Sequence, residues 1–210
     1  ICGTVLAPQA VLLHSDTCYF GVRFLPGYNP VLGSSEIMFQ LVNHQIPLDE
    51  LIQDRRMLEG ICSTTDFRKQ IRAFMRSYMN IYRRACPMEH SNLLVLHSSN
   101  LLIRSAGSIS IEQLAEDTGY TARYIDRCFR NETGLSPKQL AKIVRFQAAV
   151  SALNQNQHKG RSLTEIAADL GYFDQSHFVH DFKAYTGLTP KKYQKLLLHD
   201  SFEEKLRIVQ

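Results

Sequence analysis

The amino-acid sequence predicts an α+β fold. An all-α C-terminal domain of two helix-turn-helix motifs joined by a long linker helix follows a partial β-rich segment and further helices. Two observations carry this prediction. A helical segment occurs twice, within residues 110–140 and 162–193. Alternating apolar residues near the N-terminus indicate a strand, and apolar residues at helical spacing come after it. We expect four parts: a β-rich segment at 1–62, a helical linker or dimerisation region at 63–106, the double motif at 107–198 and a tail at 199–210.

The composition is that of ordinary globular domains. The chain has 210 residues and a net charge of +4, a mildly basic balance that is compatible with nucleic acid but does not prove it. Its five cysteines form no CxxC pair, which favours free thiols in a reducing, cytoplasmic compartment. No apolar run approaches the ~18 residues of a membrane span. The first residue is Ile1, so we expect that the N-terminal start is missing.

The first 60 residues show strand patterning. Cys18, Phe20, Val22 and Phe24 alternate with other residues up to Pro26, which is typical of a half-buried strand. Val11, Leu12 and Leu13 suggest a second strand, and Pro47 to Ile52 opens a short helix with acidic residues in its first turn.

Residues 64–104 are predicted to be helical. The first helix carries a long apolar stripe at helical spacing, and most of its basic residues fall on other faces. The stripe consists of Phe67, Ile71, Phe74, Met75, Tyr78, Ile81 and Tyr82. It could be a core face or a dimer face, and the sequence leaves both open. A second helix follows Pro87, and a short polar break at 104–108 marks the expected domain boundary.

Each copy of the repeat has the spacing of a helix-turn-helix motif. A capping-box pair opens the first helix of each copy, namely Ser110 with Gln113 and Ser162 with Glu165. These helices stop at Gly119 and Gly171, which suit the left-handed residue of a tight turn. The second helices end near Gly134 and Gly187, and each is followed by a cap and a proline that start another helix.

The second helix of each copy has one buried and one polar face. In copy one, from about Thr121, the expected buried residues are Ile125, Cys128 and Phe129, and the exposed stripe is Arg123, Asp126, Arg127 and Arg130. In copy two the equivalent stripe is Ser176, Val179, His180 and Lys183, with Gln175 before it. These are the surfaces on which the two copies differ.

A linker helix is predicted over 136–156, with an apolar stripe at Ile143, Phe146, Val150 and Leu153. A helix of ~20 residues is ~30 Å long. This length is close to the ~34 Å of one DNA turn, at which two recognition helices enter successive major-groove segments on one face of a duplex. The match favours DNA binding by a single chain.

The repeat resembles the DNA-binding domain of the AraC/XylS family of bacterial transcription regulators. The second-motif signature of the family stands here as Ile166-Ala167, Gly171-Tyr172, Asp174-Gln175-Ser176-His177-Phe178, Phe182-Lys183, Gly187 and Pro190. The resemblance implies base-reading positions at Arg123, Asp126 and Arg127, and at Gln175, Ser176 and His180. The family commonly has arginine where this chain has His180, so copy two should bind less tightly. FGVRFLPG and IPLDEL resemble part of a sensor domain, which in this family is usually a cupin-like β-barrel.

The predicted DNA-binding residues are therefore Thr121, Arg123, Asp126, Arg127, Arg130, Gln175, Ser176, His180 and Lys183. Arg123 and Arg127 could read guanine or pair with Asp126. Asp126 could accept from cytosine or orient the two arginines. Four lysines near helix starts, Lys138, Lys142, Lys191 and Lys192, could contact phosphates or be solvated.

Double-stranded DNA is the expected partner, at an asymmetric site because the two stripes differ. A small-molecule effector, a contact with RNA polymerase and a homodimer are compatible further partners. No membrane partner, cofactor or metal is expected, since His177, His180 and Asp181 fit no zinc spacing. The chain contains no G-x-S-x-G, P-loop or HExxH motif, so an enzyme is not expected. The competing hypothesis is a ligand-sensing or protein-interaction module whose motifs have lost DNA affinity.

Overall fold

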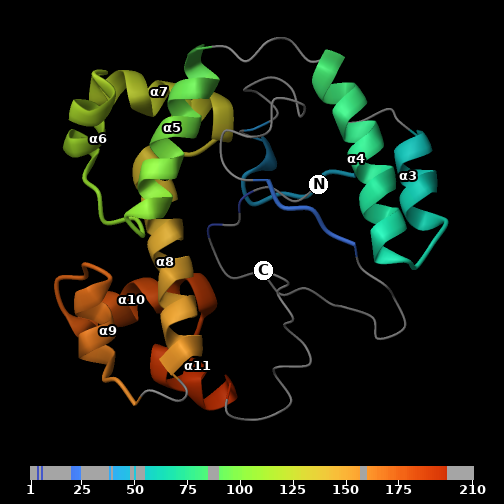
Figure 1. Cartoon of the computed structure of the whole chain (residues 1–210). Helices are drawn as coiled ribbons and strands as arrows, with labels where there is room; N and C mark the ends of the chain where they lie inside the picture. The colour runs from blue at the N-terminus through green and yellow to red at the C-terminus, as the bar shows by residue number, and fades with distance from the viewer. Residues whose placement is uncertain are drawn as a thin grey trace. The chain divides into compact units, whose positions relative to one another are not determined.

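The computed structural model describes residues 4, 6, 20–24, 38, 40–47, 50, 55–84, 90–156 and 160–197. The elements with defined bounds are α3 (Arg55–Cys62), α4 (Phe67–Arg84), α5 (His90–Arg104), α6 (Ile111–Thr118), α7 (Ala122–Thr133), α8 (Pro137–Gln155), α9 (Leu163–Asp169), α10 (Gln175–Thr186) and α11 (Pro190–Leu197) (Figure 1). They form two compact units. The first unit contains α3, α4, most of α5 (up to Asn100), α6 and α7. The second contains the end of α5, α8 from Lys138 onward, and α9, α10 and α11.

Helices α3 and α4 pack side by side as a hairpin in the first unit (Figure 1). Met57 of α3 is buried, and a Cβ added at Gly60 would lie 3.0 Å from the Cβ of Ala73, so the two backbones approach closely. The carboxylate of Asp66 accepts backbone N–H groups at the start of α4. The amide of the buried Gln70 donates to the carbonyl of Ile61 at the end of α3 and to that of Thr64 in the connecting turn. These bonds hold the hairpin closed.

The expected β-rich, cupin-like segment is wrong for the described part of residues 1–62, which contains no strand beyond a single bridge residue at Gln45. Residues 20–24 lie in neither a strand nor a helix. Instead, Phe20 lies against Phe67 of α4 with the ring centroids 5.8 Å apart, and Phe24 lies 5.2 Å from Tyr78. Alternation places Phe20 and Phe24 on one side of an extended segment. A helix can cover that side as well as a second strand can.

Other N-terminal predictions differ in outcome. Val11 to Leu13, with residues 18, 19, 25 and 26 of the predicted first strand, lie outside the described residues. In the predicted helix from Pro47, the backbone N–H of Glu50 donates to the carbonyl of Pro47 at 3.2 Å. Helix α3 was not predicted, because only Met57 among its eight residues is buried and the apolar pattern is too short to signal it.

The apolar stripe on α4 is divided between two environments. Phe74 and Tyr78 are half-buried and pack against the rings of Phe20 and Phe24. The other edge is largely exposed and consists of Phe67, Ile71, Met75 and Tyr82 of the stripe together with Met79, with exposed fractions from 36% to 55%. Phe67 belongs to it although its ring also contacts Phe20. The stripe is thus a packing face along one edge, and it leaves a row of apolar side chains open along the other.

The helix predicted after Pro87 is confirmed as α5, and its buried side chains include Leu94, Val95 and Leu102. In the first unit it is joined to α7, because Glu132 accepts hydrogen bonds from the side chains of Ser91, at 2.8 Å, and Asn92. The polar break after α5 is a turn that includes two residues of positive φ, Ala106 and Gly107.

Gly107 lies in the second unit, where its place is sterically restricted. A Cβ there would lie 2.2 Å from the backbone oxygen of Ala141 in α8, and its φ is 75°. The guanidinium of Arg145 donates to the Gly107 carbonyl at 2.6 Å. Only glycine combines this φ with so close an approach.

The predicted linker helix is confirmed as α8, one continuous helix of 19 residues. Its buried Ala149 and Leu153 belong to the core of the second unit, together with Ile166 and Ala167 of α9 and the two buried phenylalanines of α10. Phe146 and Val150 pack on this core from the same stripe, as the spacing predicted.

In the described part of the chain, no helix is both long and apolar enough to cross a membrane. The four parts proposed from the sequence, with the three boundaries between them, stay predictions.

Candidate nucleic-acid interface

The two motifs are built on the same turns. Gly119 and Gly171, which follow α6 and α9, have φ values of 73° and 71°. Gly134 and Gly187 end α7 and α10 with φ values of 72° and 71°. Left-handed backbone costs other residues roughly 1–2 kcal/mol, so glycine is favoured at all four positions. The predicted role of the turn glycines is confirmed.

A threonine at the end of each second helix strengthens the shared turn. The hydroxyl of Thr133 donates to the carbonyl of Phe129 at 2.7 Å and accepts the N–H of Leu135. Thr186 does the same at the end of α10, with 2.9 Å to the carbonyl four residues earlier. Neither threonine was predicted from the sequence, although both stand directly before matched Gly-Leu pairs. That repeat was the signal that could have identified them.

The second helices begin at capped positions. The hydroxyl of Thr121 accepts the backbone N–H of Tyr124 at 3.3 Å. In the second motif the carboxylate of Asp174 accepts the N–H of His177 at 2.7 Å. Thr121, a predicted DNA contact, therefore has a structural role as an N-cap while remaining exposed.

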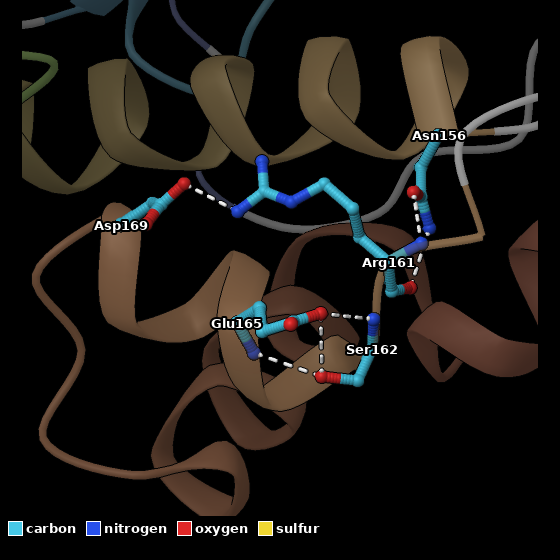
Figure 2. A network of polar contacts seen from close by, with 5 residues as sticks. All are labelled: Asn156, Arg161, Ser162, Glu165 and Asp169. Carbon is cyan, nitrogen blue, oxygen red and sulfur yellow. Dashed lines mark hydrogen bonds and ion pairs between the residues drawn. The ribbon is translucent and has the colours of Figure 1, made fainter.

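Figure 2 shows the polar network that opens the second motif. Glu165 accepts the N–H of Ser162 at 2.7 Å, and the Ser162 hydroxyl accepts the N–H of Glu165, which confirms the predicted capping box. The backbone N–H and the hydroxyl of Ser162 both donate to the Glu165 carboxylate, and these two hydrogen bonds lower its pKa. The Asn156 amide pairs with both the N–H and the carbonyl of Arg161, whose guanidinium binds Asp169. The network fixes where α9 begins after α8.

The polar edge of α7 carries most of the positive charge of the first motif. Ile125, Cys128 and Phe129 are buried as predicted, with exposed fractions of 4% or less. The exposed side holds Arg123, Arg127 and Arg130, with Asp126 half-buried between them. The edge thus presents three guanidinium groups and one carboxylate.

Two contacts on α7 set the directions of these groups. Asp126 binds Arg130 at 2.7 Å, in place of the expected partners Arg123 and Arg127. The guanidinium of Arg127 lies 5.0 Å from the ring centroid of Tyr124, and Tyr124 in turn stacks on Tyr120. An arginine held on an aromatic face is partly ordered before it meets a ligand. Asp126 and Arg130 are four residues apart and share one helix face, whereas the adjacent Arg127 does not face Asp126.

The polar edge of α10 has a different chemistry. Phe178 and Phe182 are fully buried beneath it. Gln175, Ser176, His180 and Lys183 are exposed as predicted, whereas Val179 of the predicted stripe is half-buried. This edge offers a carboxamide, a hydroxyl, an imidazole and one ammonium group, so it carries fewer cations than α7 does.

Neighbouring polar groups position the α10 edge. The hydroxyl of Thr164 donates to the carboxamide oxygen of Gln175 at 2.8 Å, which ties the starts of α9 and α10 together. His177 lies 3.6 Å from the carboxylate of Asp181. The imidazole of His180 is 86% exposed, and its Nδ1 atom is 4.0 Å from the same carboxylate. His180 is therefore open to a ligand.

The tyrosine that follows the second turn glycine is structural. Tyr172 is 6% exposed and packs edge to face with His177, while Arg145 of α8 lies over its ring at 5.4 Å. Burial, and then the nearby charge of Asp181, raise the pKa of Tyr172 to about 12.

The lysines expected near phosphates are exposed, and they lie near the N-terminal ends of α8 and α11. They are Lys138, Lys142, Lys191 and Lys192. Helix N-termini and lysines both favour anions. The described surfaces of the two motifs therefore suit a polyanion that also offers hydrogen-bonding edges, which is the chemistry of DNA.

Comparisons with known proteins find relatives for the part of the chain that holds the two motifs. Residues 114–196 match the model of a helix-turn-helix domain family. The chain is 38% identical over 85 residues to an uncharacterized HTH-type transcriptional regulator of Haemophilus influenzae, over 40% of this chain and 28% of that protein. It is 29% identical over 104 residues to the HTH-type transcriptional activator AarP of Providencia stuartii, over 50% and 72%. It is also 29% identical over 83 residues to the XylDLEGF operon transcriptional activator of Pseudomonas putida, over 40% and 26%.

The described residues 111–197 contain two helix-turn-helix motifs in series, joined by one continuous helix. Over this region the chain is similar to the helix-turn-helix domain family and to the transcription regulators named above. It spans about a quarter of the length of the first and third relatives named above.

Proposed function

We propose that this chain binds double-stranded DNA sequence-specifically and regulates transcription, with α7 and α10 each reading one of two successive major-groove segments. The observation that carries the proposal is the pair of exposed polar edges, Arg123/Asp126/Arg127/Arg130 and Gln175/Ser176/His180/Lys183, on helices with the same turns and caps. Helix α8, with 19 residues, is about 28 Å long at 1.5 Å per residue. That length suits two reading helices about one DNA turn apart.

Each edge supports a different kind of recognition. Arg123 and Arg127 suit the two acceptors of guanine, and Gln175 suits the donor and acceptor of adenine. Arg130, Lys183 and the lysines near helix starts suit phosphates, which fix position without reading sequence. The site bound by one chain is therefore asymmetric, with its tighter half under α7.

The proposal is tested by selecting bound duplexes from a random pool with the full chain. We expect enrichment of one non-palindromic site of roughly 16–20 base pairs, consistent with two groove segments. Affinity for that site should fall steeply with salt, because phosphate contacts release counterions. No enrichment at low salt would reject the proposal and favour the competing function, a ligand-sensing or protein-interaction module.

Control by a small-molecule effector and contact with RNA polymerase belong to this proposal as extensions. AarP and the P. putida protein are both named as transcriptional activators, which supports activation here. Titrating selected DNA with and without candidate metabolites tests the first extension. Transcription from a template carrying the selected site, with purified polymerase, tests the second.

A homodimer has one specific supporting observation, the exposed apolar edge of α4 formed by Phe67, Ile71, Met75, Met79 and Tyr82. Contiguous exposed apolar side chains are typical of an interaction surface. Sedimentation equilibrium of the full chain should show self-association that Met75→Glu weakens. A monomer at all concentrations would remove the dimer from the proposal.

A further inference from the structure

Phe173 has no counterpart in the first motif. Tyr120 and Tyr172 match at an offset of 52 residues, whereas the helix N-caps Thr121 and Asp174 match at an offset of 53. One extra residue therefore stands between the turn and the N-cap in the second motif, and it is Phe173.

This inserted side chain is 93% exposed, well above the 55% of Phe67 in the same set of exposed large hydrophobic residues. Its two neighbours have structural roles, since Tyr172 is buried in the core and Asp174 caps α10. Phe173 itself lies outside that core. An aromatic ring that stays in water does not stabilise the fold. The position of Phe173 is therefore better explained by contact with a binding partner.

The position of Phe173 relates it to the reading edge. It precedes the N-cap of α10 by one residue, and the first residues of that helix are Gln175 and Ser176. In helix-turn-helix proteins the N-terminal residues of the recognition helix contact base edges. A side chain at this point of the turn lies beside those contacts and outside the helix. This step rests on the proposed function.

Major-groove edges offer an apolar ring one suitable partner. Guanine, adenine and cytosine present hydrogen-bonding groups there, and only thymine adds a methyl group. We propose that Phe173 contacts the 5-methyl group of a thymine in the half-site under α10, and so is a specificity-determining residue that the first motif lacks. A protein partner fits less well, because a specific protein interface buries about 800 Å² on each side. The side chains next to Phe173 in sequence are a buried tyrosine and two polar residues.

The test uses the full chain and the duplex obtained by selection, with each thymine replaced in turn by deoxyuridine. This change removes the methyl group and keeps the base pairing. At one position in the α10 half, we expect dissociation constants from fluorescence anisotropy to rise about fourfold for the wild-type chain. Fourfold corresponds to the ~0.8 kcal/mol of one buried methyl group. Phe173→Ala should bind the thymine and uracil duplexes equally, and Phe173→Leu should keep part of the difference.

Arg123→Ala is the matched control, because it should weaken binding while leaving the thymine preference at the α10 half intact. Thermal melts of each variant check that folding is unchanged, as expected for a side chain that is almost fully exposed. If specific binding persists but no thymine shows a methyl preference that Phe173→Ala removes, this assignment is wrong and the proposed function stands. If Phe173→Ala alters transcription and not DNA affinity, the ring contacts a protein, which also overturns it. Failure to select any duplex rejects the proposed function first, and the assignment with it.

Discussion

The two helix-turn-helix motifs of this chain share their scaffold and differ in the exposed polar edges of α7 and α10. Gly119 and Gly171 have the same left-handed backbone conformation, and the turn threonines Thr133 and Thr186 make the same local hydrogen bonds. The exposed edges do not correspond: α7 presents three arginines, while α10 presents mostly neutral polar groups. Groups that set the backbone are kept in both copies because each has few alternatives. Exposed groups can vary at little cost to stability.

The edges also differ in how their side chains are held. On α7 an aromatic ring orders Arg127, and Asp126 pairs with Arg130. On α10 a hydrogen bond from Thr164 positions Gln175, while His180 is largely unrestrained. Charge and partial ordering both favour α7 as the source of most of the binding energy. The predictions below test that difference, from the largest expected effect to the smallest.

The largest effect is expected from removing the reading groups of one motif at a time. Arg123→Ala with Arg127→Ala should weaken binding to the selected site by about 2–6 kcal/mol, since a good bidentate contact to guanine contributes roughly 1–3 kcal/mol. Gln175→Ala with Ser176→Ala should cost less. Anisotropy titrations at fixed salt measure both, and repeated selection should show relaxed specificity at one end only. Equal losses would contradict the asymmetry between the motifs.

The two C-cap glycines should differ in their tolerance of a side chain. At Gly187 an added Cβ would meet open space, so Gly187→Ala should cost only the left-handed backbone term of roughly 1–2 kcal/mol. At Gly134 a Cβ would lie 2.5 Å from the backbone oxygen of Met38, which adds roughly 1–3 kcal/mol of overpacking. Urea unfolding measures the totals, and hydrogen exchange of α7 and α10 assigns each loss to its unit. Similar losses of unfolding free energy in the two variants would show that the backbone near Met38 shifts at little cost.

A charge placed on α10 should reduce the difference between the edges. His180→Arg adds a permanent cation at an exposed position, so we expect tighter binding and a steeper salt dependence, with a slope larger by up to about 0.9 if one phosphate is contacted. Measuring the dissociation constant at several salt concentrations tests this. An unchanged slope would place residue 180 away from the phosphates.

The smallest effect concerns pH and the caps. The pKa of Glu165 is lower in the folded chain than in the unfolded chain, so its contribution to stability is present above the unfolded pKa and is lost as pH falls through the folded pKa. Glu165→Gln should remove that part of the acid dependence of the melting temperature. The capping box expected at Ser110 and Gln113 in the first motif stays a prediction. Because Gln113 has no carboxylate, this box should add no acid dependence to the melting temperature. An acid dependence identical in wild type and Glu165→Gln would contradict this role.

Most of the double helix-turn-helix module could be predicted from the sequence because its determinants are local. The capping box of Ser162 and Glu165, the glycines at helix ends and the buried Ile125 and Phe129 depend on residues within a few positions of one another. Helical periodicity then identifies which side is exposed, so the residues of both reading edges could be listed in advance.

Other features required the tertiary structure. Alternation identified Phe20 and Phe24 as one apolar side, but it could not tell that α4, and not a second strand, covers it. Charge spacing gave Asp126 several arginines within reach, and the structure pairs it with Arg130 while Arg127 lies over the ring of Tyr124. The close approach of Gly107 to Ala141 joins segments more than 30 residues apart. Local hydrogen bonds and periodicity determined the helices, caps and exposed edges. Contacts between distant segments were decided by packing, because a pattern specifies a face and only the folded chain supplies its partner.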